Sequence, residues 1–151
     1  MRIEITVLDT GQGRSEASSA RATHVVDINA ENLSTPERLF DALAAALDFP
    51  EYFGRNWGAL YECFSDYFII EDGGLGSEFG GRAGIDADAV KIGFIHADGM
   101  VGNGSSMAAD VIDLLRYTRE ANANRAAADL CVEFVVDDPV KRAAIDAILA
   151  S

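Results

Sequence analysis

The residues best suited to acid–base chemistry are His96 and Asp98, which follow an apolar run over residues 90–95. An imidazole beside a carboxylate can transfer a proton or bind a metal ion. The sequence offers no third metal ligand nearby, so we interpret the pair as structural and predict no metal site. The next stretch, Gly99–Ser106, has the strand, glycine turn, serine and helix pattern that can hold an anion. It contains no basic residue and is equally typical of an ordinary turn with a serine N-cap, which we favour.

A second stretch, Phe49–Phe68, is suited to binding. Pro50 and Gly54 are expected to confine Phe49–Arg55 to an aromatic-rich loop, after which Asn56 stands where a helix N-cap belongs. Two sets of residues then recur at helical spacing, one apolar and one small, aromatic or acidic. The apolar stripe consists of Trp57, Leu60, Cys63, Phe64 and Tyr67, and the other side carries Gly58, Tyr61, Glu62, Ser65 and Asp66.

Strands and helices alternate along the chain that must position these residues. Residues 3–8 and 23–28 predict strands, which we expect to pair as a hairpin with a long loop. Ser34 and Glu37 fit a capping box, which predicts a first helix ending before Pro50. The remaining predicted elements are strands at 90–95 and 130–136, a helix from 107 to 120, and a terminal helix after Asp138-Pro139. This alternation predicts an α/β fold with a mostly parallel sheet.

The segment 71–89 is rich in glycine but contains neither GxGxxG nor GK[ST], so it does not predict a phosphate-binding loop. We expect a mobile surface insertion there. Cys63 and Cys131 are expected to be buried thiols, because they show neither a metal-ligand nor a CxxC spacing.

The charge excludes several classes of partner. With 25 acidic and 12 basic side chains, the formal net charge is −13. Nucleic acid and anionic membranes are therefore poor partners, whereas a basic protein is a suitable one. An acidic balance can also serve solubility alone. The first residues show no signal-peptide pattern and no run is long enough to cross a membrane, so we expect a cytoplasmic protein that needs no cofactor.

The motif PEYFGRNWGALYEC, residues 50–63, resembles the barstar family, the intracellular inhibitors of barnase-type ribonucleases. The resemblance extends over about residues 24–68 and 107–136. It implies one barstar-like α/β domain over residues 1–151, in which helices pack on a small parallel sheet. An N-terminal strand and a C-terminal helix extend that domain, and 71–89 is an insertion in it.

The resemblance also implies which residues contact the partner. Glu62 stands where the family places an acid that occupies the enzyme's phosphate site, so it would form charge-assisted hydrogen bonds with basic side chains. Gly58 replaces an acidic contact, and Glu62 is one methylene longer than the family's aspartate. The full set of implied partner-binding residues is Tyr52, Asn56, Gly58, Tyr61, Glu62, Tyr67 and Glu120.

We therefore predict a stoichiometric inhibitor, an immunity protein and not an enzyme, that blocks a basic ribonuclease or a related toxin domain. We expect it to be a monomer when free. Two alternatives remain open at this point. One is an interaction module of the same fold with a non-nuclease partner, an alternative that Gly58 leaves open. The other is a small enzyme that binds a phosphorylated ligand at the turn over residues 99–106, with His96 and Asp98.

Overall fold

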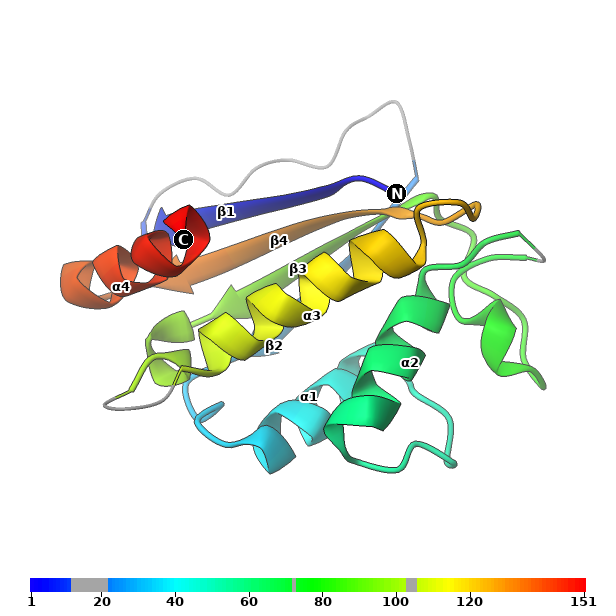
Figure 1. The fold of residues 1–151 in the computed structure, drawn as a ribbon, viewed down its shortest axis with the longest axis horizontal. Coiled ribbons are helices and arrows are strands. Elements are labelled where there is room, and N and C mark those ends of the chain that lie inside the picture. The colour runs from blue at the N-terminus through cyan, green and yellow to red at the C-terminus, as the bar shows by residue number, and fades with distance from the viewer. Residues whose placement is uncertain (12–21, 72, 103–105) are drawn as a thin grey trace.

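The computed structural model describes residues 1–11, 22–71, 73–102 and 106–151. Its centre is a four-stranded sheet in which all neighbouring strands are parallel, in the order β1-β4-β3-β2 (Figure 1). The strands are β1 (Ile3–Asp9), β2 (Thr23–Asn29), β3 (Ala89–Ile95) and β4 (Asp129–Val136). The expected α/β fold is confirmed, with a sheet that is parallel throughout.

Helices α1, α2 and α3 cover one face of this sheet, and α4 packs beside α3 against β1 and β4 (Figure 1). Two short 3₁₀ helices, η1 and η2, follow α2 and β3 in the chain. The bounds are α1 (Pro36–Leu47), α2 (Trp57–Tyr67), η1 (Ser77–Phe79), η2 (Ala97–Met100), α3 (Met107–Ala121) and α4 (Pro139–Ala150).

The core lies between the sheet and these helices. Alternate residues of paired strands point to the same face, so one cross-strand row after another is apolar. One such row runs through Val7, Phe134, Phe94 and Ile28, all of them buried. The next residues along point to the opposite face, where Lys91 Nζ lies 3.3 Å from Glu133 Oε1 and both side chains are buried.

The first strand is not where the sequence suggested. The expected hairpin of β1 with β2 is wrong, because the two strands lie at opposite edges of the sheet and β1 pairs in parallel with β4. The alternation of apolar and polar residues in β1 fixes which face is buried, but it does not specify the neighbouring strand. Arg142 of α4 reaches Asp9 at 2.7 Å, so the first strand and the last helix also hold each other.

Two local predictions also need correction. The first helix is capped by Thr35, whose hydroxyl accepts from Arg38 N at 3.4 Å, and not by the Ser34 and Glu37 capping box. The 71–89 segment is not a simple surface insertion, since Leu75 and Phe79 in it are buried in the core. The N-caps that the sequence placed at Asn56, Ser106 and Asp138 are confirmed.

No helix within the described ranges is long and apolar enough to span a membrane.

Candidate functional site

The loop before α2 presents an aromatic ring to solvent. Tyr52 is 69% exposed, the most exposed of the four tyrosines, while its neighbours Phe49 and Phe53 pack on each other at 5.2 Å between ring centroids. Asn56 ends the loop, and its side-chain oxygen accepts a hydrogen bond of 2.8 Å from Ala59 N. The loop therefore has an apolar anchor and a capped helix on either side of a tyrosine that is itself free to bind.

Helix α2 presents the acidic side that the sequence predicted, except that Ser65 is buried and its hydroxyl lies 3.5 Å from that of Thr118. Gly58 and Glu62 are exposed and Tyr61 is half-buried, whereas Leu60, Cys63 and Phe64 point into the core. Within the described part of the chain, the Glu62 carboxylate makes no hydrogen bond or ion pair. A carboxylate that is held on a packed helix and keeps its charge uncommitted is available to a cationic group of another molecule.

Aromatic rings connect α1, α2 and α3 into a continuous series. Phe40 and Trp57 meet edge to face at 5.1 Å, Trp57 and Tyr61 lie 6.5 Å apart, and Tyr61 and Tyr117 lie 4.9 Å apart. The series begins in the core and ends on the surface, because Tyr117 is 47% exposed. Contacts of this kind hold ring orientation and reduce the entropy lost on binding.

The sequence prediction missed Tyr117. It lies on a stripe of α3 formed by Asp110, Asp113, Tyr117 and Glu120, which follow one another at intervals of three and four residues. The spacing of these residues is visible in the sequence, but the packing of α3 against α2 is not. Glu120 is exposed one turn beyond Tyr117, on the same side of α3. Together with the residues from α2 and its loop, Tyr117 and Glu120 form what we call the candidate binding face.

The acids of α3 and α2 give this face a negative field. Burial raises the pKa of the Tyr61 hydroxyl, and the nearby Asp113 and Asp110 carboxylates raise it further. Burial likewise raises the pKa of Asp66, Arg125 lowers it, and Glu62 and Glu78 raise it. Burial is the larger cause of both shifts, and the neighbouring carboxylates add a negative potential that favours the approach of a cation.

Tyr67 does not belong to the face as the free protein is folded. It is 2% exposed and packs against Phe68 and Phe79 at 5.2 and 6.4 Å between ring centroids. Five residues separate it from Glu62, which at about 100° per residue turns it roughly 140° around the helix, toward the core. The ring is therefore not open to a partner in this conformation, and its role as a partner contact stays a prediction.

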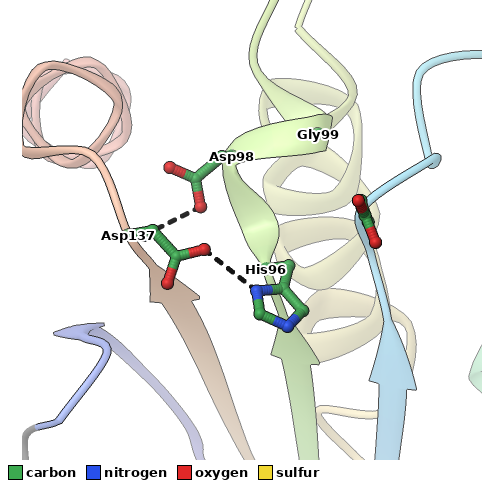
Figure 2. Close-up of a pocket in the computed structure, with 5 residues that line it drawn as sticks. His96, Asp98, Gly99 and Asp137 are labelled. Carbon is green, nitrogen blue, oxygen red and sulfur yellow. Dashed lines mark hydrogen bonds and ion pairs between the residues drawn. The ribbon is translucent and has the colours of Figure 1, made fainter.

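A second polar region lies where β3 and β4 end (Figure 2). This sheet-end cluster consists of Glu31, His96, Asp98, Gly99 and Asp137, which line a shallow, open pocket.

The members of the cluster bind one another. His96 Nδ1 lies 2.9 Å from Asp137 Oδ2, and the two carboxylate oxygens of Asp98 accept from the backbone N–H groups of Asp137 and Asp138, each at 2.8 Å. Thr10 also hydrogen-bonds Asp137. The hydrogen bond to Asp137 and then its charge raise the pKa of His96, while Thr10 and then His96 lower that of Asp137. These groups attach the end of β3 to the turn before α4.

Gly99 completes this joint by allowing a close approach. A Cβ at Gly99 would lie 2.0 Å from the carbonyl oxygen of Glu31, so the turn after β2 packs directly on η2. The glycine turn over residues 99–106, which could hold an anion by its sequence pattern, is described only in part, since residues 103–105 lie outside the described residues. Among the residues that are described, no three His, Cys, Asp or Glu side chains come together in a way that could hold a metal ion.

The parallel sheet and the helices on its face define a small α/β protein, and the candidate site is an open surface. Residues 23–135 match the family model Barstar (barnase inhibitor), and the chain belongs to this family. No curated protein matches the chain in sequence. The match begins at β2 and stops one residue short of the end of β4, so β1 and α4 lie outside it.

Proposed function

We propose that the protein is a stoichiometric inhibitor of a basic, barnase-type ribonuclease and that the candidate binding face covers the enzyme's active site. The observation that carries this proposal is Glu62, an exposed carboxylate with no partner among the described residues, on a helix whose opposite side is buried. The family's description as barnase inhibitors supports the same class of partner.

The chemistry of the face fits such a partner. A ribonuclease binds RNA phosphates with lysine and arginine side chains, and a carboxylate can replace a phosphate oxygen among them. Tyr52, Tyr61 and Tyr117 supply rigid aromatic area around that acid, and tyrosine is enriched among residues that dominate binding energy. The net charge of −13 would accelerate encounter with a cationic enzyme.

The phosphate-ligand alternative has less support. Glu31, Asp98 and Asp137 surround His96 at the sheet end, and three carboxylates repel a phosphate. Asp98 is also engaged by two backbone N–H groups, so it holds the fold together there. An interaction module with a non-nuclease partner uses the same face, and the experiment that follows separates it from the leading proposal.

The test is a titration of the protein into barnase and related ribonucleases, reading the residual rate of RNA cleavage. We expect activity to fall linearly to zero at one inhibitor per enzyme, with association that slows as salt is raised. Glu62→Lys should abolish inhibition. Asp146→Lys on α4 is the control for net charge, because it makes the same change at an exposed site outside the family match. It also removes the 3.8 Å ion pair of Asp146 with Arg142, so its unfolding is measured alongside.

Equal inhibition by Glu62→Lys and the parent protein would show that Glu62 is not the anchor. If the parent protein inhibits none of these ribonucleases, the non-nuclease alternative takes the place of the leading proposal.

A further inference from the structure

Two buried hydroxyl groups near the end of α2 form no hydrogen bond with another group of the described protein. Among the described residues, Tyr67 Oη and Ser77 Oγ are the buried side-chain oxygens without a partner. Burying a hydroxyl without a hydrogen bond costs free energy, since its bonds to water are lost and not replaced. Such groups are few in native proteins, and each one calls for an explanation.

Both hydroxyls lie at one loop, residues 75–85, whose two ends are joined. Ser77 lies within this loop, and Tyr67 lies under it. Leu75 and Ile85 exchange two backbone hydrogen bonds of 2.9 and 3.0 Å, which join the two ends of the loop. Gly74 and Gly84, the residues that precede Leu75 and Ile85, pack backbone to backbone beside this pair, where a Cβ on Gly84 would lie 2.5 Å from Gly74. A compact surface loop with paired ends can open without unfolding the elements around it.

The part of the loop that lies over Tyr67 is held by few contacts. Gly76 N donates to the Tyr67 carbonyl at 3.0 Å, and the Phe79 ring inserts next to the rings of Tyr67 and Phe49. Arg82 then lies 4.9 Å above the Phe79 ring and pairs with Asp48 at 2.8 Å, where the Asp48 side chain is 89% exposed. One backbone hydrogen bond, one buried ring and one exposed ion pair therefore hold this part of the loop closed.

Two glycines flank η1, the short helix at the centre of the loop. Gly76 and Gly80, on either side of η1, have φ angles of +78° and +74°, which side chains larger than hydrogen rarely adopt. Burial raises the pKa of Tyr67 to about 12, Arg82 lowers it, and Asp48 raises it. The hydroxyl is thus kept from water by a segment that makes no hydrogen bond to it.

We propose that Ser77–Arg82 is a displaceable cover, which closes over Tyr67 in the free protein and opens as a unit to present the Tyr67 hydroxyl to the bound partner. In the open state both hydroxyls regain hydrogen bonds, which offsets the loss of the Phe79 contacts. The second part of this proposal, the contact of Tyr67 with a bound partner, rests on the proposed function and is called the partner arm. The cover adjoins the binding loop, since Phe49 touches both Phe79 and Phe53.

Native-state hydrogen exchange of the free protein tests the cover without any partner. The amides of Gly76, Phe79 and Gly80 donate to backbone oxygens within the loop or to Tyr67, so their exchange reports its opening. We expect them to exchange through a local opening that low denaturant does not change, while Ala128, which donates to Phe68, exchanges only on global unfolding.

Two variants and a control sharpen the result. Tyr67→Phe removes the hydroxyl that has no protein partner, so the closed state becomes more stable relative to the open state. The cover amides should therefore exchange about ten-fold more slowly. Phe79→Ala should accelerate their exchange and bring the pKa of Tyr67 down from about 12 toward its ordinary value, measured by ultraviolet titration. Tyr61→Phe is the control and should leave the cover amides unchanged.

The cover is overturned if its amides exchange only with global unfolding, or if Tyr67→Phe accelerates their exchange. The second outcome would mean that the hydroxyl holds a bound water which the variant loses. With a ribonuclease that the parent inhibits, Phe79→Ala should raise the association rate, and an unchanged rate overturns the partner arm alone. If no ribonuclease binds, the proposed function fails while the exchange data on the free protein still decide the cover.

Discussion

The candidate binding face and the sheet-end cluster are both rich in acids, yet they use them in opposite ways. At the sheet end, the Asp98 and Asp137 carboxylates are engaged by backbone N–H groups, His96 and Thr10. On the binding face, Glu62 engages none of the described residues. Acids with internal partners stabilise the fold, whereas an acid held without one on a rigid surface is available to another molecule. Substitutions in the two regions should therefore separate affinity from stability.

The largest effect is expected at Glu62. Glu62→Ala should cost about 2–5 kcal/mol of binding to an inhibited ribonuclease, a range for which barnase and barstar are themselves among the reference cases. Stability should change by less than about 0.5 kcal/mol, because the residue is exposed. Association and dissociation rates, with urea unfolding of the same samples, measure both. A loss of stability as large as the loss of affinity would place Glu62 with the sheet-end acids.

The reverse pattern is expected at Asp98. Asp98→Ala removes the acceptor of two backbone hydrogen bonds and should destabilise the protein by about 2 kcal/mol. Inhibition measured well below the unfolding transition should match that of the parent protein. A weakened complex formed by fully folded Asp98→Ala would show that the sheet end belongs to the interface.

A smaller effect should link Tyr61 and Tyr117. Their ring centroids lie 4.9 Å apart on different helices, so removing one ring should change how tightly the other binds a partner. A double-mutant cycle with Tyr61→Ala, Tyr117→Ala and the combined variant should give a coupling energy of about 0.5–1.5 kcal/mol in binding. Independent effects would mean that α3 lies outside the interface, and the candidate binding face would then shrink to α2 and its loop.

The smallest effect concerns the His96–Asp137 pair, whose two side chains are about half exposed. The pKa of His96 is raised in the folded protein, so its contribution is complete below the unfolded pKa of about 6.5 and is lost as pH rises through the raised value. The pKa of Asp137 is lowered, so its contribution is lost only as pH falls below about 3.8, through that lowered value.

Thermal unfolding of the parent protein and His96→Asn, followed from pH 4 to 9, checks this pair. Asn is chosen because it tolerates the left-handed conformation of His96, whose φ is +58°. The parent should have the higher melting temperature below pH 6.5, and the two curves should converge above the raised pKa. If the two melting temperatures differ by the same amount at all pH values, the difference comes from the backbone conformation at residue 96 and not from the ion pair.

Local signals in the sequence predicted much of the fold. Pro50, Gly54 and Asn56 mark where the binding loop ends and α2 begins, because each acts on the backbone next to it. The spacing of apolar residues in α2 predicted that Glu62 faces outward and Leu60 inward, and the structure places both so. It also placed Tyr67 in the apolar stripe, and its burial agrees with that spacing and not with the residue-by-residue resemblance.

Features that depend on distant parts of the chain could not be read in the same way. The partner of β1 is β4, more than a hundred residues away, and alternation within β1 is the same for any neighbour. Tyr117 becomes part of the binding face only because α3 packs against α2. Phe79 is buried although it is surrounded by glycines, since it inserts next to aromatic rings from two other segments.

The pairing of β1 with β4 has a consequence for how the chain folds during synthesis. Strand β1 must wait until Asp129–Val136, more than a hundred residues later in the chain, has been made before it finds its neighbour. The intervening segment holds every other strand and the first three helices, so it can collapse around β2 and β3 beforehand. Closing so long a loop carries an entropic cost, and distant pairings form slowly. On the ribosome, β1 is therefore expected to reach its native place later than β2 and β3, although it is made before them.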